Sequence, residues 1–209
     1  MRLKDFVAVY GQPYSSMLGI NLKSHRNEDI VKWFLAAILY SKPIRESSAT
    51  RTYQCFERHG ITTARPIIAA GWDRLVSILD EGGYTRYDFS TADKLLEVFG
   101  NLEKLYGGKL NRLCEASGNP AELEANLRKL GKGIGDTTVS IFLRDMTQIW
   151  TKAEPRPTPL VAMALKRLRI TDLKRYAKKH QIDVVRLETA LVRYSKIFLK
   201  KGKTMRIVP

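Results

Sequence analysis

The residues best suited to chemistry lie in the segment Leu130-Gly-Lys-Gly-Ile-Gly-Asp-Thr-Thr-Val139. Gly133 and Gly135 permit a tight turn and a close approach of the backbone to another molecule, and Ile134 can fill the space between two helices. If a helix begins near Asp136, its first-turn amides point outward from the positive end of the helix dipole and can hold a phosphate. A plain helical hairpin with a glycine cap explains the same residues, and the net charge of +15 favours the phosphate interpretation.

Histidine and cysteine give no comparable signal. His25, His59 and His180 are far apart in the sequence and no Cys-x-x-Cys accompanies them, so neither a zinc site nor a nucleophile–base pair is predicted. We interpret Cys55 and Cys114 as reduced core thiols, because two cysteines cannot stabilise a secreted disulfide scaffold of 209 residues.

Apolar residues at helical spacing predict the elements that must position the glycine segment. Helices are expected over about 30–38, 91–99, 139–149, 160–168 and 184–200. Ser90 has capping-box spacing to Asp93, and Gly100 is expected to end the second of these helices. Thr158-Pro159 is expected to cap and begin the fourth. Because no sustained apolar–polar alternation occurs, the sequence predicts an all-α fold.

Charge points to a polyanionic partner. The chain has 36 Lys and Arg against 21 Asp and Glu, which favours nucleic acid over an anionic membrane surface. Residues 171–209 alone hold 11 Lys or Arg and 3 Asp or Glu, so this segment forms a basic extension. The most apolar run, 33–40, is too short to cross a bilayer, and the N-terminal residues lack a signal-peptide core. We therefore expect a cytoplasmic or nuclear protein without membrane contact.

The chain resembles the helix-hairpin-helix (HhH-GPD) superfamily of DNA glycosylases, to which endonuclease III belongs. Gly133-Ile-Gly135, followed by Thr138 and Ile141-Phe-Leu-Arg144, is similar to the hairpin and second helix of that family. Phe34-Leu-Ala-Ala-Ile-Leu-Tyr-Ser41, followed by Arg45-Glu46, is similar to its early buried helix and the DNA-facing turn after it. The resemblance covers about residues 28–170. It implies a two-lobed helical protein that binds duplex DNA containing a damaged or flipped base.

The resemblance and the charge together name the residues expected to contact DNA. In the turn after the early helix, Lys42, Pro43 and Ile44 are candidates for a wedge that enters the gap left by a flipped base. A turn that simply terminates a helix explains the proline equally well. The expected DNA-binding residues are Lys132, Gly133, Ile134, Gly135, Thr137 and Thr138 of the hairpin, Lys42, Pro43 and Arg45 of the turn, and Arg193, Lys196 and Lys200 of the basic extension.

Departures from the family pattern concern the reaction. Thr137 stands where bifunctional members have the lysine that forms a Schiff base, which disfavours a lyase acting through that position. Pro157 aligns with the family's catalytic aspartate, so Glu154 and Asp145 are the candidate replacements, with a solvated surface charge as the alternative for each. No cysteine follows Cys114, so no iron–sulfur cluster and no other cofactor is expected.

We predict a central helical lobe over 28–130, a second lobe formed by 1–27 with 131–170, and a basic helical extension over 171–209. The expected function is that of a DNA-binding protein of base excision repair, a monofunctional glycosylase-like enzyme acting on damaged or mismatched bases. Two alternatives stay open. One is a catalytically inactive helix-hairpin-helix module that recognises DNA structure or lesions, and the other is a helical protein-interaction module whose charge serves solubility. The location expected for a DNA partner is the nucleoid in the cytoplasm, or the nucleus.

Overall fold

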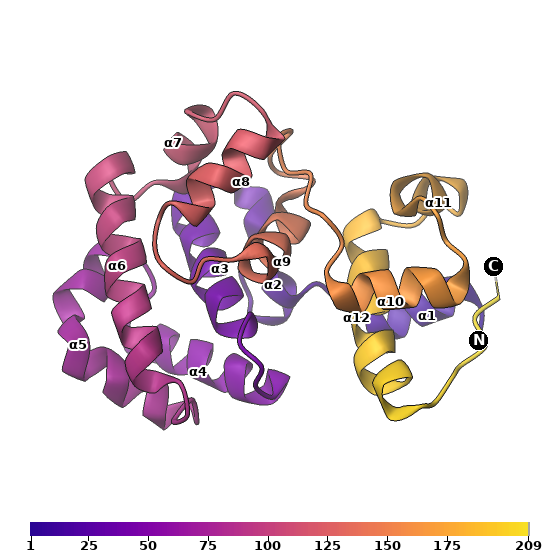
Figure 1. Cartoon of the computed structure of the whole chain (residues 1–209), viewed down its shortest axis with the longest axis horizontal. Helices are drawn as coiled ribbons and strands as arrows, with labels where there is room; N and C mark the ends of the chain where they lie inside the picture. Colours follow the sequence, from indigo (N-terminus) through magenta and orange to yellow (C-terminus); the bar gives the residue numbers. More distant parts are fainter. Residues whose placement is uncertain (209) are drawn as a thin grey trace. The chain divides into compact units, whose positions relative to one another are not determined.

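The computed structural model describes residues 1–208, and its fold is all-α, as the periodicity predicts (Figure 1). Within these residues the only β pairing is an isolated bridge between Arg2 and Val208. The chain divides into two compact units. The large unit is Leu18–Glu154, and the small unit combines Met1–Met17 with the residues from Pro155 onward.

The large unit is built around helix α3, Asn27–Tyr40, whose residues from Trp33 to Leu39 are fully buried. The Trp33 indole donates a hydrogen bond to the Phe142 carbonyl at 3.0 Å, and the Phe34 ring packs edge-on against Phe99 and Phe142. These contacts pack α3 against the two helices that carry Phe99 and Phe142. The other elements are η1 (Leu22–Ser24), α4 (Glu46–Arg58), α5 (Ala64–Glu81), α6 (Asp88–Tyr106), α7 (Leu110–Glu115), α8 (Pro120–Arg128) and α9 (Asp136–Met146).

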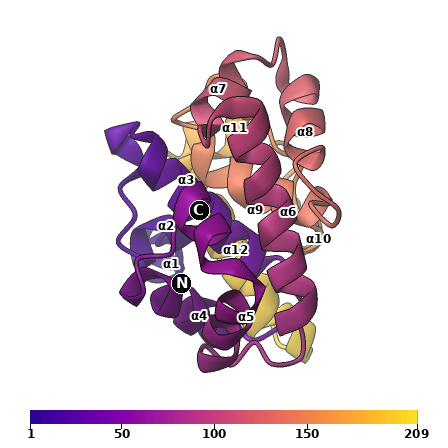
Figure 2. The ribbon, with the colours of Figure 1, turned by 90° about the vertical axis from the view of Figure 1, so that its left-hand side faces the viewer.

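Helix α6 is longer than the sequence indicates. The expectation that Gly100 ends it is wrong, because α6 continues to Tyr106 and Gly107 takes the left-handed cap conformation at φ +61°. Its start is at Asp88 instead of after Ser90. A glycine inside a helix costs about 1 kcal/mol relative to alanine. Burial of Leu102 and packing along α5 outweigh that cost, and Figure 2 shows the two helices side by side.

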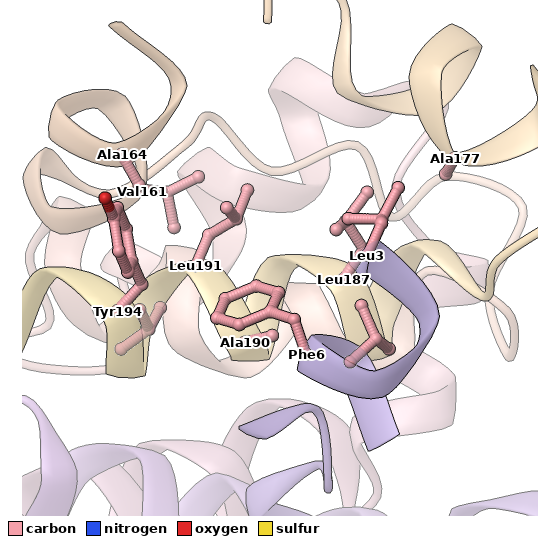
Figure 3. Packing of buried hydrophobic residues seen from close by; sticks show 11 residues of the cluster. Leu3, Phe6, Val161, Ala164, Ala177, Leu187, Ala190, Leu191 and Tyr194 are labelled. Atoms are coloured by element: carbon pink, nitrogen blue, oxygen red, sulfur yellow. The ribbon is translucent and has the colours of Figure 1, made fainter. Parts of the chain in front are cut away.

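The small unit has its own apolar core (Figure 3). Leu3 and Phe6 of α1 pack with Leu187 and Leu191 of α12, and Val161 of α10 joins them. Thr158 caps α10 by accepting a hydrogen bond from the Val161 amide, which confirms the predicted helix start. The elements of this unit are α1 (Leu3–Tyr10), α2 (Tyr14–Met17), α10 (Pro159–Leu168), α11 (Leu173–Lys179), α12 (Val184–Ile197) and η2 (Leu199–Lys201).

The observed units differ from the three segments expected from the sequence. Residues 131–154 belong with the central helices, because α9 packs on α3 through Phe142. Residues 171–208 form part of the small-unit core with α1 instead of a separate extension. No helix of the described residues is long and apolar enough to span a membrane.

Candidate nucleic-acid interface

The predicted hairpin lies in residues 129–135, which connect α8 to α9 and are called the glycine loop below. Gly133 has φ +88°, a left-handed conformation that favours glycine. Ile134 is 4% exposed and fills the interior side of the loop, as its apolar side chain predicts. Gly135 is the N-cap of α9 in an extended conformation, and a Cβ added there would meet no atom within 4 Å. The backbone at the start of α9 is therefore open to an approaching molecule.

The first turn of α9 carries a group of unsatisfied donors. Among the described residues, the amides of Gly135, Asp136, Thr137 and Thr138 have no hydrogen-bond acceptor. The Val139 amide is not one of these donors, because it donates a hydrogen bond to the Gly135 carbonyl at 3.1 Å. The Gly135 and Thr137 positions are exposed, whereas the Thr138 side chain is buried, so Thr138 can offer only its amide.

The shape of the glycine loop is set by one face of α6. Asn101 donates to the Leu130 carbonyl at 2.9 Å, the Glu97 carboxylate accepts from the Lys132 amide at 3.0 Å, and Lys94 Nζ donates to the Gly133 carbonyl at 3.0 Å. A Cβ at Gly131 would lie 2.6 Å from Val98 Cγ2, so the loop backbone also presses directly on this helix. The contacting positions on α6 have the spacing of a single helix face. We call residues 94, 97, 98 and 101 the α6 track.

Lys94 is the most unusual member of the α6 track. It is 8% exposed, and burial, together with the charge and hydrogen bonding of Lys42, lowers its pKa to about 8. The Lys42 ammonium also lies 5.3 Å from the centre of the Tyr87 ring, where Arg86 is a second cation at 5.7 Å. Lys42 and Lys94, called the lysine pair below, therefore link the turn after α3 to the glycine loop.

The turn after α3 presents its predicted residues unequally. Pro43 and Arg45 are exposed, whereas Lys42 and Ile44 are half-buried. The Ile44 amide donates to the Lys42 carbonyl at 2.8 Å, which closes a tight turn with Pro43 at its tip. Pro43 is thus the most prominent of the wedge candidates.

Acidic side chains near the glycine loop are already neutralised or engaged. Arg128 Nη2 lies 2.9 Å from Asp136 Oδ1 and 2.8 Å from Glu124 Oε2. Glu97 is engaged by the Lys132 amide, while the Lys132 residue itself is exposed. The acidic residue in the first turn of α9 therefore carries its own counter-ion.

Two of the predicted basic residues of the C-terminal region make structural contacts. Arg193 Nη1 donates to the carbonyls of Tyr10, at 2.5 Å, and Gln12, at 2.7 Å, and the guanidinium lies 4.6 Å from the centre of the Tyr14 ring. Lys196 Nζ is 5.6 Å from the same ring. Lys200 is exposed. Arg193 therefore holds the segment after α1, and a DNA contact by these residues stays a prediction.

The two candidate catalytic carboxylates have very different surroundings. Asp145 Oδ1 lies 2.9 Å from Arg144 Nε, with side chains 1% and 2% exposed. Such a buried pair holds its carboxylate away from any bound molecule. Glu154 is exposed and follows α9 in the chain, and Pro157 is also exposed. Of the two carboxylates, only Glu154 is accessible.

Sequence reasoning missed three polar residues that shape this region, namely Lys94, Glu97 and Asn101. Their spacing of three and four is visible in the sequence, but polar residues at this spacing are equally typical of a solvated helix face. In the described part of the chain, no three His, Cys, Asp or Glu residues group as metal ligands. Comparisons with protein-family models, curated proteins and solved structures found no match to this chain.

Proposed function

We propose that the protein binds double-stranded DNA through the phosphate backbone at the start of α9. The observation that carries the proposal is the run of unsatisfied amides from Gly135 to Thr138 beside the exposed Lys132 and the lysine pair. Phosphate oxygens accept hydrogen bonds from helix N-terminal amides and are favoured by the helix dipole. Such contacts carry no base identity, so binding through this region is expected to be independent of sequence.

The electrostatics of the region agree with an anionic ligand. Lys42 and Lys94 repel each other, and a phosphate near them would relieve that repulsion and favour the charged form of Lys94. Asp136 would oppose a phosphate, but its ion pair with Arg128 reduces this effect. DNA binding should therefore be accompanied by proton uptake at mildly alkaline pH.

The resemblance to helix-hairpin-helix DNA glycosylases extends the proposal to base excision repair. An active form would be a monofunctional glycosylase, with Glu154 as the accessible carboxylate that stabilises positive charge on the sugar or orients water. The second candidate is a catalytically silent DNA-binding module. The burial of Asp145 against Arg144 favours this second candidate, because it removes one of the two replacement acids.

The binding proposal is tested by fluorescence anisotropy of a short labelled duplex over a range of salt concentrations. Each neutralised phosphate should contribute a slope of about −0.9 to the dependence of log K on log salt. Lys132→Gln should weaken binding and reduce the slope by about 1. Lys104→Gln is the matched control, because Lys104 is exposed near the far end of α6, and it should leave both quantities unchanged. Salt-independent or undetectable binding by the parent protein would favour the helical protein-interaction module.

Catalysis is tested separately with duplexes that contain uracil, 8-oxoguanine, hypoxanthine, alkylated bases or an abasic site. Release of a base, detected by alkali cleavage, and its loss in Glu154→Gln with DNA affinity retained would support the glycosylase. DNA binding without base release from any duplex would support the silent module. A DNA partner of either kind implies a location at the nucleoid or in the nucleus.

A further inference from the structure

A second basic region lies in the small unit, where the end of α10 meets the segment after η2. Here a cavity of about 400 Å³ opens to solvent, within the range of about 300–1,000 Å³ typical of small-molecule sites. Its apolar side includes Leu168, Tyr194, Met205 and Ile207. Its basic side includes Arg167, Arg169 and Arg206, and no acidic residue lines it.

The three arginines of this cavity have no counter-ion. Among the described residues, none of their guanidinium groups makes an ion pair or a hydrogen bond. All three residues are exposed, so their donors are available to a ligand. A planar guanidinium binds phosphate through two parallel hydrogen bonds and also stacks on aromatic rings.

The apolar side of the cavity is held in place by its own contacts. Tyr194 is buried with its ring edge-on to Phe6, and its hydroxyl donates to the Met205 carbonyl at 3.2 Å. This bond ties the segment after η2 to α12. The cavity therefore combines a fixed apolar surface with three unpaired cations.

Arg169 occupies a backbone position that favours glycine. It follows α10 with φ +55° and ψ +38°, a left-handed conformation that costs a non-glycine residue about 1 kcal/mol or more. Cations near a helix C-terminus interact favourably with the helix dipole, which is a structural explanation for Arg169. If Arg169 serves only the helix end, its replacement by glycine should lower the stability of the protein. If Arg169 instead serves a ligand, glycine should leave stability unchanged or raise it, because the backbone strain is relieved.

We propose that this cavity binds a nucleotide, with the phosphate held by Arg167, Arg169 and Arg206 and the base against the apolar side. The ligand has two possible sources, a free mononucleotide or the phosphorylated end of a DNA strand, which share the same chemistry. The proposal does not depend on the glycine loop, because every residue that lines the cavity belongs to the small unit.

The test is calorimetric titration of the full chain with deoxyadenosine 5′-monophosphate, deoxyadenosine and inorganic phosphate. We expect the nucleotide to bind more tightly than either part, and Arg169→Gly and Arg206→Gln each to weaken it about tenfold. Arg175→Gln is the matched control, because Arg175 is an exposed residue of the same unit that does not line the cavity. It should change affinity less than about twofold.

Thermal melting of Arg169→Gly separates binding from structure. Unchanged or increased stability together with weaker nucleotide binding supports the proposal, whereas lower stability with unchanged binding shows that Arg169 serves only the helix end. A single-stranded oligonucleotide with and without a 5′-phosphate distinguishes the two sources. Absence of nucleotide binding in the parent, or an equal loss in Arg175→Gln, overturns the proposal.

Discussion

Replacing Lys94 by methionine tests the cost of holding the lysine pair beside the glycine loop. The pKa of Lys94 is lowered to about 8, against about 10.4 for a free lysine, because burial and the Lys42 ammonium oppose its charge. This difference corresponds to about 3 kcal/mol. Below about pH 8, Lys94 is charged in both the folded and the unfolded protein, so this cost lowers the free energy of unfolding in full. Between there and about pH 10.4 the unfolded chain holds the proton more tightly, so the free energy of unfolding rises with pH.

Methionine keeps the length of the side chain without its charge. Losing the bond from Lys94 Nζ to the Gly133 carbonyl costs about 1 kcal/mol. Near neutral pH, Lys94→Met should therefore be more stable than the parent by about 2 kcal/mol. Above about pH 10.4 the charge cost is gone, and the variant should be less stable by about 1 kcal/mol. The sign of the difference should thus reverse with pH.

Urea unfolding followed by tryptophan fluorescence measures this difference for the large unit alone, because Trp33, Trp72 and Trp150 all lie in it. Taking variant minus parent at each pH cancels the titration of groups common to both. Lys104→Met is the control, because Lys104 is exposed on the same helix and should show no pH-dependent difference. A difference for Lys94→Met that stays constant from neutral to alkaline pH would refute the reasoning.

Three further substitutions probe the candidate site and the small unit. Gly135→Val should weaken binding to all duplex sequences alike in anisotropy. It should change stability by less than about 1 kcal/mol in melting, because a Cβ at this position meets no atom within 4 Å. Asp145→Asn should lower the free energy of urea unfolding by about 3 kcal/mol, since it leaves Arg144 without its buried carboxylate. An unchanged free energy of unfolding in this variant would show that the Arg144–Asp145 pair does not stabilise α9. Arg193→Gln should speed limited proteolysis between Tyr10 and Tyr14, and an unchanged cleavage rate would contradict its structural role.

Most helices were predictable because their signals are local. The apolar spacing of α3 and the Thr158-Pro159 pair before α10 depend on residues within one or two turns, and both predictions are confirmed. The end of α6 was not predictable from Gly100, because a local cost of about 1 kcal/mol was outweighed by packing on a neighbouring helix. Helix identity therefore followed from period, whereas helix length depended on tertiary contacts.

The residues of the candidate interface were predictable only in part. Glycine predicts a left-handed or open backbone and isoleucine predicts burial, and Gly133 and Ile134 have these properties in the structure. The segment could therefore be identified from its residue types alone. The contacts of Arg193 could not be predicted from the sequence, because its acceptors lie more than 180 positions earlier in the chain. The predicted boundary between the lobes was wrong for the same reason, because Trp33 and Phe142 lie 109 positions apart in the sequence and share one core.

The α6 track fixes the direction in which the glycine loop enters α9. A free loop would take its shape only from α8, α9 and its own glycines, so nothing else would orient the amides that follow it. Here the loop backbone is bound at Leu130, Lys132 and Gly133 by side chains of another helix, and Val98 excludes any residue larger than glycine at Gly131. The α6 contacts therefore fix the loop just before Gly135. The orientation of the Gly135–Thr138 amides is then a property of the whole large unit, which is why the local sequence alone leaves the choice between a phosphate site and a plain helical hairpin open.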